Sequence, residues 1–149
     1  MPQIAFNTPI GPLALFEADG AIVAIDWGWL PENEESPLLL KARDQLEEYF
    51  EGKRKVFDLP LAPHGTSFQR KVWTALSEIP FGTTLTYGQL ADKLGTAPRA
   101  LGGACGRNPI PVVIPCHRVL AAGGGLGGYS GIDGIETKEF LLRIEGARP

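Results

Sequence analysis

The chain has 149 residues, which suits one domain or two small ones with a shared core, and its 44% hydrophobic content is ordinary for a globular protein. No segment approaches the roughly 20 consecutive apolar residues of a membrane span, and the start, Met1-Pro2-Gln3, lacks the charged and apolar regions of a signal peptide. We therefore expect a cytoplasmic protein, and in that reducing compartment Cys105 and Cys116 should be free thiols.

The net charge of −3 is divided unevenly along the chain. Residues 1–65 carry eleven acidic and five basic side chains, a net charge of −6, whereas residues 66–149 carry six acidic and nine basic ones, a net charge of +3. This asymmetry is typical of a DNA-binding module joined to an acidic, solvent-facing one, although a difference of this size also arises by chance.

The first 65 residues predict a small antiparallel sheet covered by one helix. Short strands with turn sequences between them are expected at residues 4–6, 13–16 and 22–27. Ser36 can cap a helix that has Pro37 at its first position and ends at Gly52. The apolar stripe of this helix should cover the sheet and consists of Leu39, Ala42, Leu46, Tyr49 and Phe50. Residues 53–65 are expected to connect the two halves.

The second half predicts helices. Thr66 with Gln69, and Thr86 with Gln89, have the spacing of a capping box. The first of these helices should stop at Pro80 and bury one face, formed by Phe68, Val72, Leu76 and Ile79. The second should end at Gly95, after which Pro98 can open another. Two short helices joined by a tight turn are a candidate helix-turn-helix, although this spacing also fits any helical hairpin.

We therefore predict an α+β fold with two domains. Residues 1–65 form a small N-terminal antiparallel sheet with a helix and a linker, and residues 66–149 form a mostly helical domain that contains the helix-turn-helix.

The expected helix over residues 98–105 is built from small residues. Its two consecutive glycines, Gly102 and Gly103, each disfavour a helix by about 1 kcal/mol, so we infer that something approaches the backbone closely. The phosphate and sugar of a nucleic-acid groove would fit. Arg99 is the one long polar side chain of this helix. A helix that recognises base edges in a major groove would normally carry several such side chains.

The segment Ile114-Pro115-Cys116-His117-Arg118 places a thiol beside an imidazole in a turn stiffened by proline. Attack by sulfur requires the thiolate, and neighbouring cationic or hydrogen-bonding groups favour it. Because adjacent residues usually point apart, we expect His117 to reach Cys116 through a water molecule, with a third group orienting the imidazole. The alternative is a buried structural cysteine beside a surface histidine.

Several segments, in order, carry a resemblance to a known family: Tyr87-Gly88-Gln89-Leu90, Gly106-Arg107-Asn108-Pro109, Pro115-Cys116-His117-Arg118-Val119 and Gly128-Tyr129-Ser130-Gly131. Together they closely resemble the O6-alkylguanine-DNA alkyltransferases, also called methylated-DNA–protein-cysteine methyltransferases. The resemblance covers about Thr66 to Gly146. It implies direct-reversal DNA repair, in which an alkyl group on guanine O6, or on thymine O4, is transferred once to Cys116 after base flipping, without a cofactor.

The resemblance also implies roles for individual residues. Cys116 would be the acceptor, His117 its base, Glu145 the carboxylate that orients the histidine, and Asn108 the hinge that holds the helix end against the active-site turn. The substrate pocket would be formed by the Tyr87 hydroxyl toward guanine N3, the Val119 carbonyl toward the exocyclic amine, the Tyr129 ring and a Ser130 donor toward O6. DNA would be contacted by Arg99, which fills the gap left by the flipped nucleotide, and by Ala100, Gly102, Arg107 and Arg118.

Certain family members carry zinc in the N-terminal domain, but His64 is the one histidine or cysteine before Cys105, so we expect no metal here. We expect a monomer that acts on double-stranded DNA. Three alternatives stay open: an alkyltransferase-like protein that binds lesions without repairing them, a helix-turn-helix regulator, and a cysteine hydrolase. The stoichiometry of alkyl transfer separates them, because repair stops at one equivalent, a hydrolase turns over, and the other two only bind.

Overall fold

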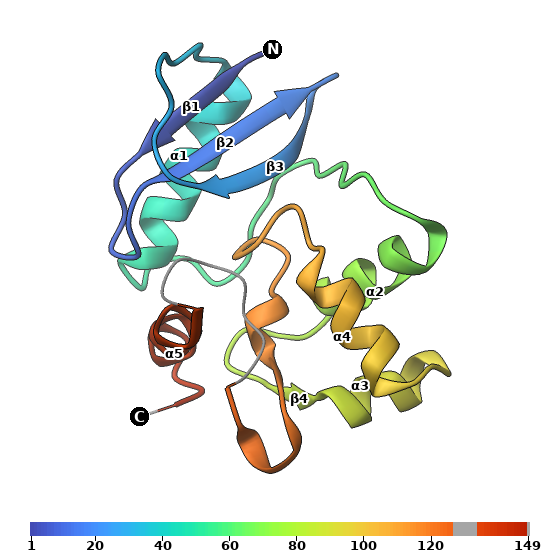
Figure 1. Cartoon of the computed structure of the whole chain (residues 1–149). Coiled ribbons are helices and arrows are strands. Elements are labelled where there is room, and N and C mark those ends of the chain that lie inside the picture. The colour runs from blue at the N-terminus through green and yellow to red at the C-terminus, as the bar shows by residue number, and fades with distance from the viewer. Residues whose placement is uncertain (127–133, 149) are drawn as a thin grey trace. The chain divides into compact units, whose positions relative to one another are not determined.

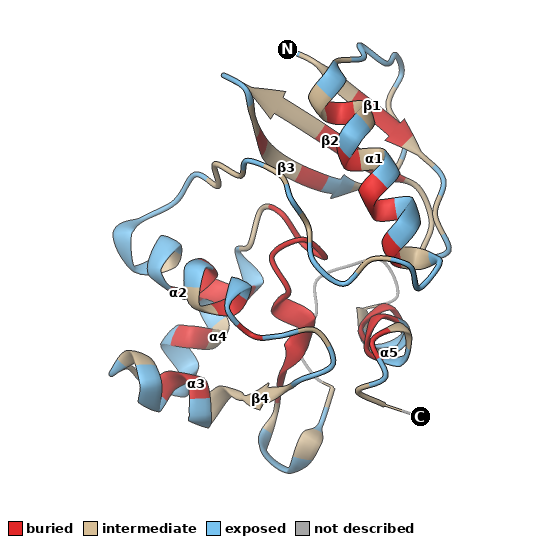
Figure 2. Cartoon of the chain, turned by 180° about the vertical axis from the view of Figure 1, so that it is seen from behind, coloured by how far each residue is buried: buried red, intermediate tan, exposed pale blue. Residues whose placement is uncertain are grey.

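The computed structural model describes residues 1–126 and 134–148. The chain divides into two units, Met1–His64 and Gly65–Pro149, and the division falls where the sequence changes from acidic to basic. Each unit has buried side chains of its own (Figure 2).

The first unit contains a three-stranded antiparallel sheet, with β1 (Gln3–Phe6), β2 (Leu13–Ala18) and β3 (Ala21–Trp27) in that order (Figure 1). Asp19 and Gly20 join β2 to β3 and both have positive φ, 51° and 78°. Two successive positive φ values are typical of a type I′ turn, for which Asp-Gly is a preferred sequence. The predicted sheet is therefore confirmed, and local turn chemistry builds its hairpin.

Helix α1 (Pro37–Phe50) packs against this sheet. The Ser36 hydroxyl caps it by accepting from the Leu39 backbone N–H at 3.1 Å, and Pro37 occupies the first turn. The buried face of the helix carries Leu39, Ala42, Gln45, Leu46 and Tyr49. The predicted stripe differs at two positions: Phe50 is only partly buried, and Gln45 was not expected there. The buried amide of Gln45 exchanges two hydrogen bonds with the backbone of Asp58.

The segment after α1 also belongs to this unit. The backbone of Ile22 donates to the Pro60 carbonyl and accepts from the Ala62 N–H, both at 2.9 Å. This short parallel bridge places residues 60–62 along β3. The expected linker is therefore hydrogen-bonded to the sheet over part of its length.

The second unit contains four helices among its described residues: α2 (Ser67–Ser77), α3 (Tyr87–Leu94), α4 (Pro98–Gly106) and α5 (Gly134–Ile144). Both capping boxes form, at Thr66 and at Thr86. Gly95 ends α3 in the left-handed conformation, with φ 66°, and α4 follows after three residues. The predicted helix-turn-helix is α3 and α4, which pack against each other.

Helix α2 supports α4 from the other side. The buried Trp73 ring donates its Nε1–H to the Ala104 carbonyl at 2.9 Å. We expected Phe68 on the buried face of α2, but its side chain is 37% exposed, and Trp73 joins Val72 and Leu76 there instead.

A two-stranded parallel pairing brings distant segments of the second unit together. Strand β4 (Leu85–Thr86), which leads directly into α3, pairs with β5 (Val119–Leu120). The 3₁₀ turn η1 (Cys116–Arg118) immediately precedes β5, and a second one, η2 (Ala122–Gly124), follows it. The start of α3 is thereby fixed beside the segment that carries Cys116.

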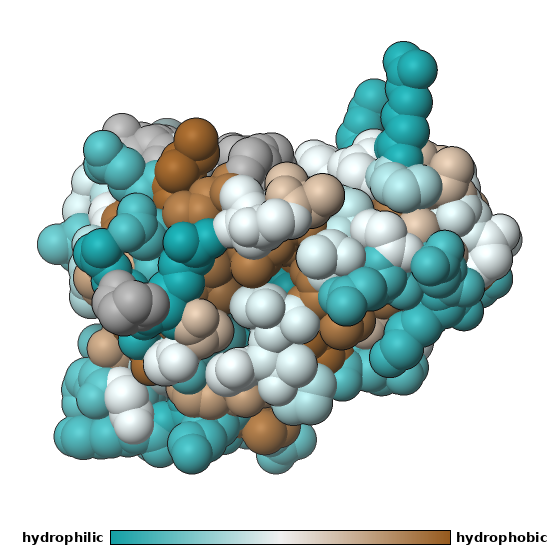
Figure 3. Space-filling model, turned by 90° about the horizontal axis from the view of Figure 1, so that it is seen from below, coloured by the Kyte–Doolittle hydropathy of each residue, from teal (hydrophilic) through white to brown (hydrophobic). Residues whose placement is uncertain are grey.

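Among the described residues, no helix is both long and apolar enough to cross a membrane. On the face drawn in Figure 3, hydrophobic residues reach the surface in several separate places among hydrophilic ones.

Candidate active site and DNA-facing helix

The turn before Cys116 is held by the side chain of Asn108. Its Oδ1 accepts from the Ile110 N–H, and its Nδ2 donates to the Ile114 carbonyl, both at 2.9 Å. The Ile114 carbonyl also accepts from the Cys116 N–H at 2.8 Å. Asn108, two residues after the end of α4, therefore fixes the shape of the chain up to the thiol.

The backbone of this turn is tightly folded. Pro115 has φ −82° and ψ 66°, values of an inverse γ-turn, which explains the hydrogen bond from Cys116 back to Ile114. Val112 has φ 72°, a rare value for a β-branched residue, and lies at the centre of a second three-residue turn closed by Val113 N–H and the Pro111 carbonyl. The side chain of Val112 is buried, at 1% exposure, so packing holds this conformation.

Cys116 lies inside the protein, at 7% exposure. Burial raises the pKa of its thiol, while a hydrogen bond from the Asn108 side chain and the charge of Lys138 act in the opposite direction. Because burial dominates, the resting group is the thiol, and a base must take its proton before sulfur can attack.

His117 and Arg118 share one carboxylate, that of Glu145. His117 Nε2 lies 2.7 Å from Glu145 Oε2, and the Arg118 guanidinium donates to both carboxylate oxygens, at 2.8 and 3.0 Å. The remaining Arg118 nitrogen donates to the Ile79 carbonyl at 2.6 Å. A bidentate arginine keeps a carboxylate ionised, and an ionised carboxylate only accepts hydrogen bonds. His117 Nε2 therefore carries a proton that it donates to Glu145.

The other ring nitrogen of His117 is then the basic one. Burial lowers the pKa of His117 below 6.5, against the opposing effect of Glu145, so the imidazole is neutral at pH 7. Its Nδ1 is buried and has no hydrogen-bond partner within the parts of the chain that the structure describes. The site thus combines a neutral His117, which is oriented by Glu145 and has a lone pair available on Nδ1, with the neighbouring protonated thiol of Cys116. This is the composition of a base-activated nucleophile.

Helix α4 presents a different kind of surface. Leu101, Ala104 and Cys105 face the interior, whereas Arg99 and Ala100 are exposed. A Cβ atom added at Gly102 or Gly103 would meet no atom of the described residues within 4 Å. Packing inside the protein therefore does not require these glycines, which leaves a smooth outer face with Arg99 at its start.

Comparisons with known proteins identify the family. Two family models match the chain: the 6-O-methylguanine DNA methyltransferase, ribonuclease-like domain over residues 3–63, and the 6-O-methylguanine DNA methyltransferase, DNA binding domain over residues 67–147. The chain belongs to the 6-O-methylguanine DNA methyltransferase family. The expected resemblance is confirmed. It also extends to the N-terminal part, where the sequence showed the pattern of a sheet and a helix but no family motif.

Individual relatives are similar to this chain over nearly its whole length. A methylated-DNA–protein-cysteine methyltransferase of Methanosarcina acetivorans is 44% identical over 155 residues, covering 95% of this chain and 96% of the relative. The constitutive enzyme of that name from Bacillus subtilis is 43% identical and covers 93% and 92%. The crystal structure of Mycobacterium tuberculosis OGT in complex with DNA has a TM-score of 0.88 and 39% identity, covering 99% of this chain and 94% of that one.

Within this family fold, Tyr87 and Val119 lie on neighbouring elements. Tyr87 is the first residue of α3 and is half-buried, and desolvation raises the pKa of its hydroxyl to about 12, so the group is a donor at neutral pH. The Val119 carbonyl accepts from Lys138 Nζ at 2.7 Å and keeps a second lone pair for another donor. Tyr129 and Ser130, also predicted in the pocket, lie outside the described residues.

One predicted DNA contact is corrected by the structure. Arg118 was expected to contact DNA, but its side chain is only 8% exposed and is engaged with Glu145, with the Ile79 carbonyl and with the face of the Phe81 ring. A guanidinium committed to a buried carboxylate cannot neutralise a phosphate as well. The remaining predicted contacts, Arg99, Ala100, Gly102 and Arg107, belong to α4 or directly follow it.

Sequence reasoning also missed a residue at the site. Lys138 is 1% exposed, although a lysine in a helix usually lies at the surface. A signal was present: Lys138, Leu141 and Glu145 recur at the spacing of one helix face, and Leu141 belongs to the core.

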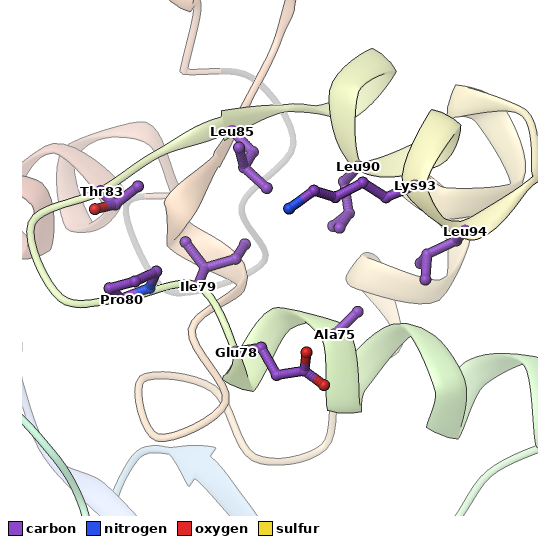
Figure 4. Close-up of a pocket in the computed structure, with 9 residues that line it drawn as sticks. All are labelled: Ala75, Glu78, Ile79, Pro80, Thr83, Leu85, Leu90, Lys93 and Leu94. Atoms are coloured by element: carbon purple, nitrogen blue, oxygen red, sulfur yellow. The ribbon is translucent and has the colours of Figure 1, made fainter.

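A cavity of about 450 Å³ lies between α2, β4 and α3, and Cys116 does not line it. Its walls are mainly apolar, and Lys93 extends over it from α3 (Figure 4). Ile79 lines this cavity, and its carbonyl accepts a hydrogen bond from Arg118, which binds Glu145. Because nucleophile and base lie elsewhere, we place the chemistry at Cys116.

Proposed function

We propose that the protein is a DNA-repair alkyltransferase that removes a methyl or other alkyl group from guanine O6 in double-stranded DNA by transferring it once to its own Cys116. The observation that carries this proposal is the arrangement of Cys116 next to a neutral His117 whose imidazole is fixed by Glu145 and Arg118. The names of the relatives and the DNA complex of the Mycobacterium tuberculosis protein support the same activity.

The residues account for each step of the reaction. His117 Nδ1 takes the proton of the Cys116 thiol, directly or through one water molecule, and Glu145 stabilises the imidazolium that forms. Sulfur attacks the alkyl carbon, the S–C bond forms as the C–O6 bond breaks, and the bonding electrons pass to the guanine. The Tyr87 hydroxyl assists by donating toward guanine N3. Overall, the thiol proton and the alkyl group exchange places.

The acceptor is used only once. A thioether is not a leaving group that water displaces easily, and no part of the proposed mechanism regenerates the thiol. Burial raises the pKa of Cys105 to about 12, and its neighbours in the chain are Ala104 and Gly106, so it lacks the adjacent histidine that serves Cys116 as a base.

Access to the lesion requires that the base leave the duplex. Unstacking costs a few kcal/mol, and a lesion that weakens pairing lowers this cost. Helix α4 supports the proposal because its outer face is smooth at Gly102 and Gly103 and carries Arg99, which can occupy the vacated place in the stack. We also propose that the monomer is the active form, since Cys116, His117, Glu145 and Tyr87 all come from the second unit of one chain.

The test is intact-mass spectrometry after incubation with a duplex that contains O6-methylguanine. We expect a gain of one methyl group per chain, a plateau at one equivalent, and peptide mapping to Cys116. Cys116→Ser should abolish transfer and keep DNA binding. A methyl group on Cys105, full transfer by the Ser variant, or release of methanol with turnover would each refute the proposal.

A further inference from the structure

The indole of Trp73 connects two segments of the second unit. Trp73 belongs to α2 and is buried, at 2% exposure. Its Nε1–H donates at 2.9 Å to the carbonyl of Ala104, in the last turn of α4. The far edge of the ring lies against Gly65, where an added Cβ would be 2.5 Å from Cη2 and 2.7 Å from Cζ3. The chain at Gly65 therefore closes over the ring and holds its N–H toward α4.

The end of α4 that Trp73 contacts is wound more tightly than an α-helix. In a continuing α-helix, the Ala104 carbonyl would accept from the Asn108 N–H. Instead, the Asn108 N–H bonds to the Cys105 carbonyl and the Arg107 N–H bonds to the Ala104 carbonyl, both at 3.2 Å, which is the spacing of a 3₁₀ turn. The N–H of Trp73 gives the Ala104 carbonyl a second donor for its second lone pair. Trp73 thus favours the tightened end over a further α-helical turn.

This tightened end determines where Asn108 lies. The Asn108 side chain accepts from the Ile110 N–H and donates to the Ile114 carbonyl, both at 2.9 Å. The Ile114 carbonyl also accepts from the Cys116 N–H at 2.8 Å. A continuous series of hydrogen bonds and backbone links therefore leads from Trp73, through the end of α4, to the acceptor cysteine.

We propose that Trp73 is a positioning residue for alkyl transfer: by holding the Ala104 carbonyl it keeps the end of α4 tightened, and Asn108 can then hold the turn that presents Cys116. This inference rests on the proposed function. Arg99 lies at the opposite end of α4 and does not take part in these contacts. Trp73 should therefore act on the transfer step and leave DNA binding nearly unchanged.

Four variants separate the hydrogen bond from the packing of the ring. Replacing Trp73 with 3-benzothienylalanine puts sulfur in place of the N–H and keeps the shape of the ring system, whereas Trp73→Phe removes the N–H together with part of the ring. Trp29→Phe is the matched control, because Trp29 is 65% exposed and lies in the first unit. Asn108→Ala, alone and combined with Trp73→Phe, completes a double-mutant cycle.

The first readout is the single-turnover rate at saturating O6-methylguanine duplex, under conditions in which denaturant titration shows each variant to be folded. We expect both Trp73 variants to slow transfer by about five- to tenfold, the equivalent of one buried hydrogen bond. Alkylation by saturating free O6-benzylguanine should slow by the same factor, because both substrates use the same acceptor turn. In the Asn108→Ala background, Trp73→Phe should add no further loss, and Trp29→Phe should keep the original rate.

The second readout needs neither DNA nor a lesion. Hydrogen exchange of the Asn108 backbone amide, followed by NMR, should be faster by about the same factor in both Trp73 variants, because the tightened turn opens more often. If the proposed function failed, the unsubstituted protein would gain no methyl group from DNA, while amide exchange would still report whether Trp73 holds the end of α4.

Three results would overturn the proposal. One is an unchanged transfer rate or an unchanged Asn108 amide exchange in the folded benzothienylalanine protein, since the ring alone would then suffice. Another is full additivity of the losses in Trp73→Phe and Asn108→Ala, since Trp73 would then not act through Asn108. The last is weaker binding to undamaged duplex with an unchanged rate at saturation, which would assign Trp73 to DNA recognition.

Discussion

Within the part of the chain that the structure describes, the Glu145 carboxylate binds both His117 and Arg118. Through Oε2 it orients the base His117, and through both oxygens it binds Arg118, which is anchored to the Ile79 carbonyl. Arg118 thus fixes the carboxylate that fixes the histidine. A buried ion pair contributes little net stability, but removing one partner leaves an unmatched buried charge.

We expect Arg118→Ala to lower the free energy of unfolding by about 3–5 kcal/mol, because Glu145 would remain buried without its cation. Denaturant titration measures this loss. Arg107→Ala is the matched control: Arg107 is exposed, so its loss should leave stability nearly unchanged. Equal stability of the two variants would show that Arg118 is not needed for the buried cluster.

The rate of transfer should depend on pH in a way that reports His117. Only the neutral imidazole can accept a proton, and burial lowers the pKa of His117 below 6.5. Single-turnover rates should therefore fall on acidification with a midpoint below pH 6.5. The unfolded chain takes up this proton near pH 6.5 and the folded chain does not, so stability should also decrease as the pH falls below that value. A midpoint above 6.5 would contradict a buried neutral histidine.

At the scale of elements, the features that depend on local sequence signals could be predicted. Contacts between side chains far apart in the sequence could not. The two capping boxes, the Asp19-Gly20 turn and the left-handed Gly95 are set by residues within one or two turns, and all formed as predicted. The hydrogen-bond partners described above for Arg118 and Lys138 lie 19 to 39 residues away, and a charged side chain alone indicates a surface position. Glu145 was assigned through the family resemblance, which carries long-range contacts that periodicity does not.

Two glycines of the second unit should respond in opposite ways to alanine. A Cβ at Gly65 would lie 2.5 Å from Trp73 Cη2, so Gly65→Ala should cost about 1–3 kcal/mol as the buried ring shifts. A Cβ at Gly102 meets nothing within the described residues, so Gly102→Ala should stabilise the helix by about 0.4–1 kcal/mol. If α4 lies in a DNA groove, Gly102→Ala should nevertheless weaken DNA binding. Thermal unfolding and fluorescence anisotropy measure the two effects.

Arg99 offers a test of base extrusion by the same helix. Arg99→Ala should slow repair of duplex O6-methylguanine much more than alkylation by free O6-benzylguanine, which needs no flipping. The exposed position of Arg99 makes a folding defect an unsuitable explanation for that difference. Equal losses on both substrates would instead indicate a change in the pocket.

On the scale of the whole molecule, the two units differ in charge, and the burial of Arg118 and Lys138 reduces the number of cations that can reach DNA. The first unit is acidic, and two of its five cations, Lys41 and Arg43, pair with carboxylates. Binding to undamaged DNA should therefore depend on few phosphate contacts.

The salt dependence of DNA binding measures those contacts. Each neutralised phosphate adds about −0.9 to the log-log slope, so the slope should be shallow and Arg107→Ala should flatten it by about one contact. Lys41→Ala and Arg43→Ala should leave the slope of log affinity against log salt concentration unchanged. A slope set by these two residues and insensitive to Arg107 would place the DNA surface on the other unit.

The conformation of Val112 bears on how the protein acquires activity during folding. A β-branched residue at φ 72° is unfavourable in isolation and persists only where surrounding structure over-determines it. The turn that presents Cys116 therefore depends on the packing of Val112 as well as on the hydrogen bonds of Asn108, whereas the capped helices around it carry local signals of their own. Formation of the helices should precede formation of the turn, and the thiol should meet His117 and Asn108 in their working positions only in the last folding step. Maturation of the acceptor is then a late kinetic event, and a newly made chain acquires its fold before its reactivity.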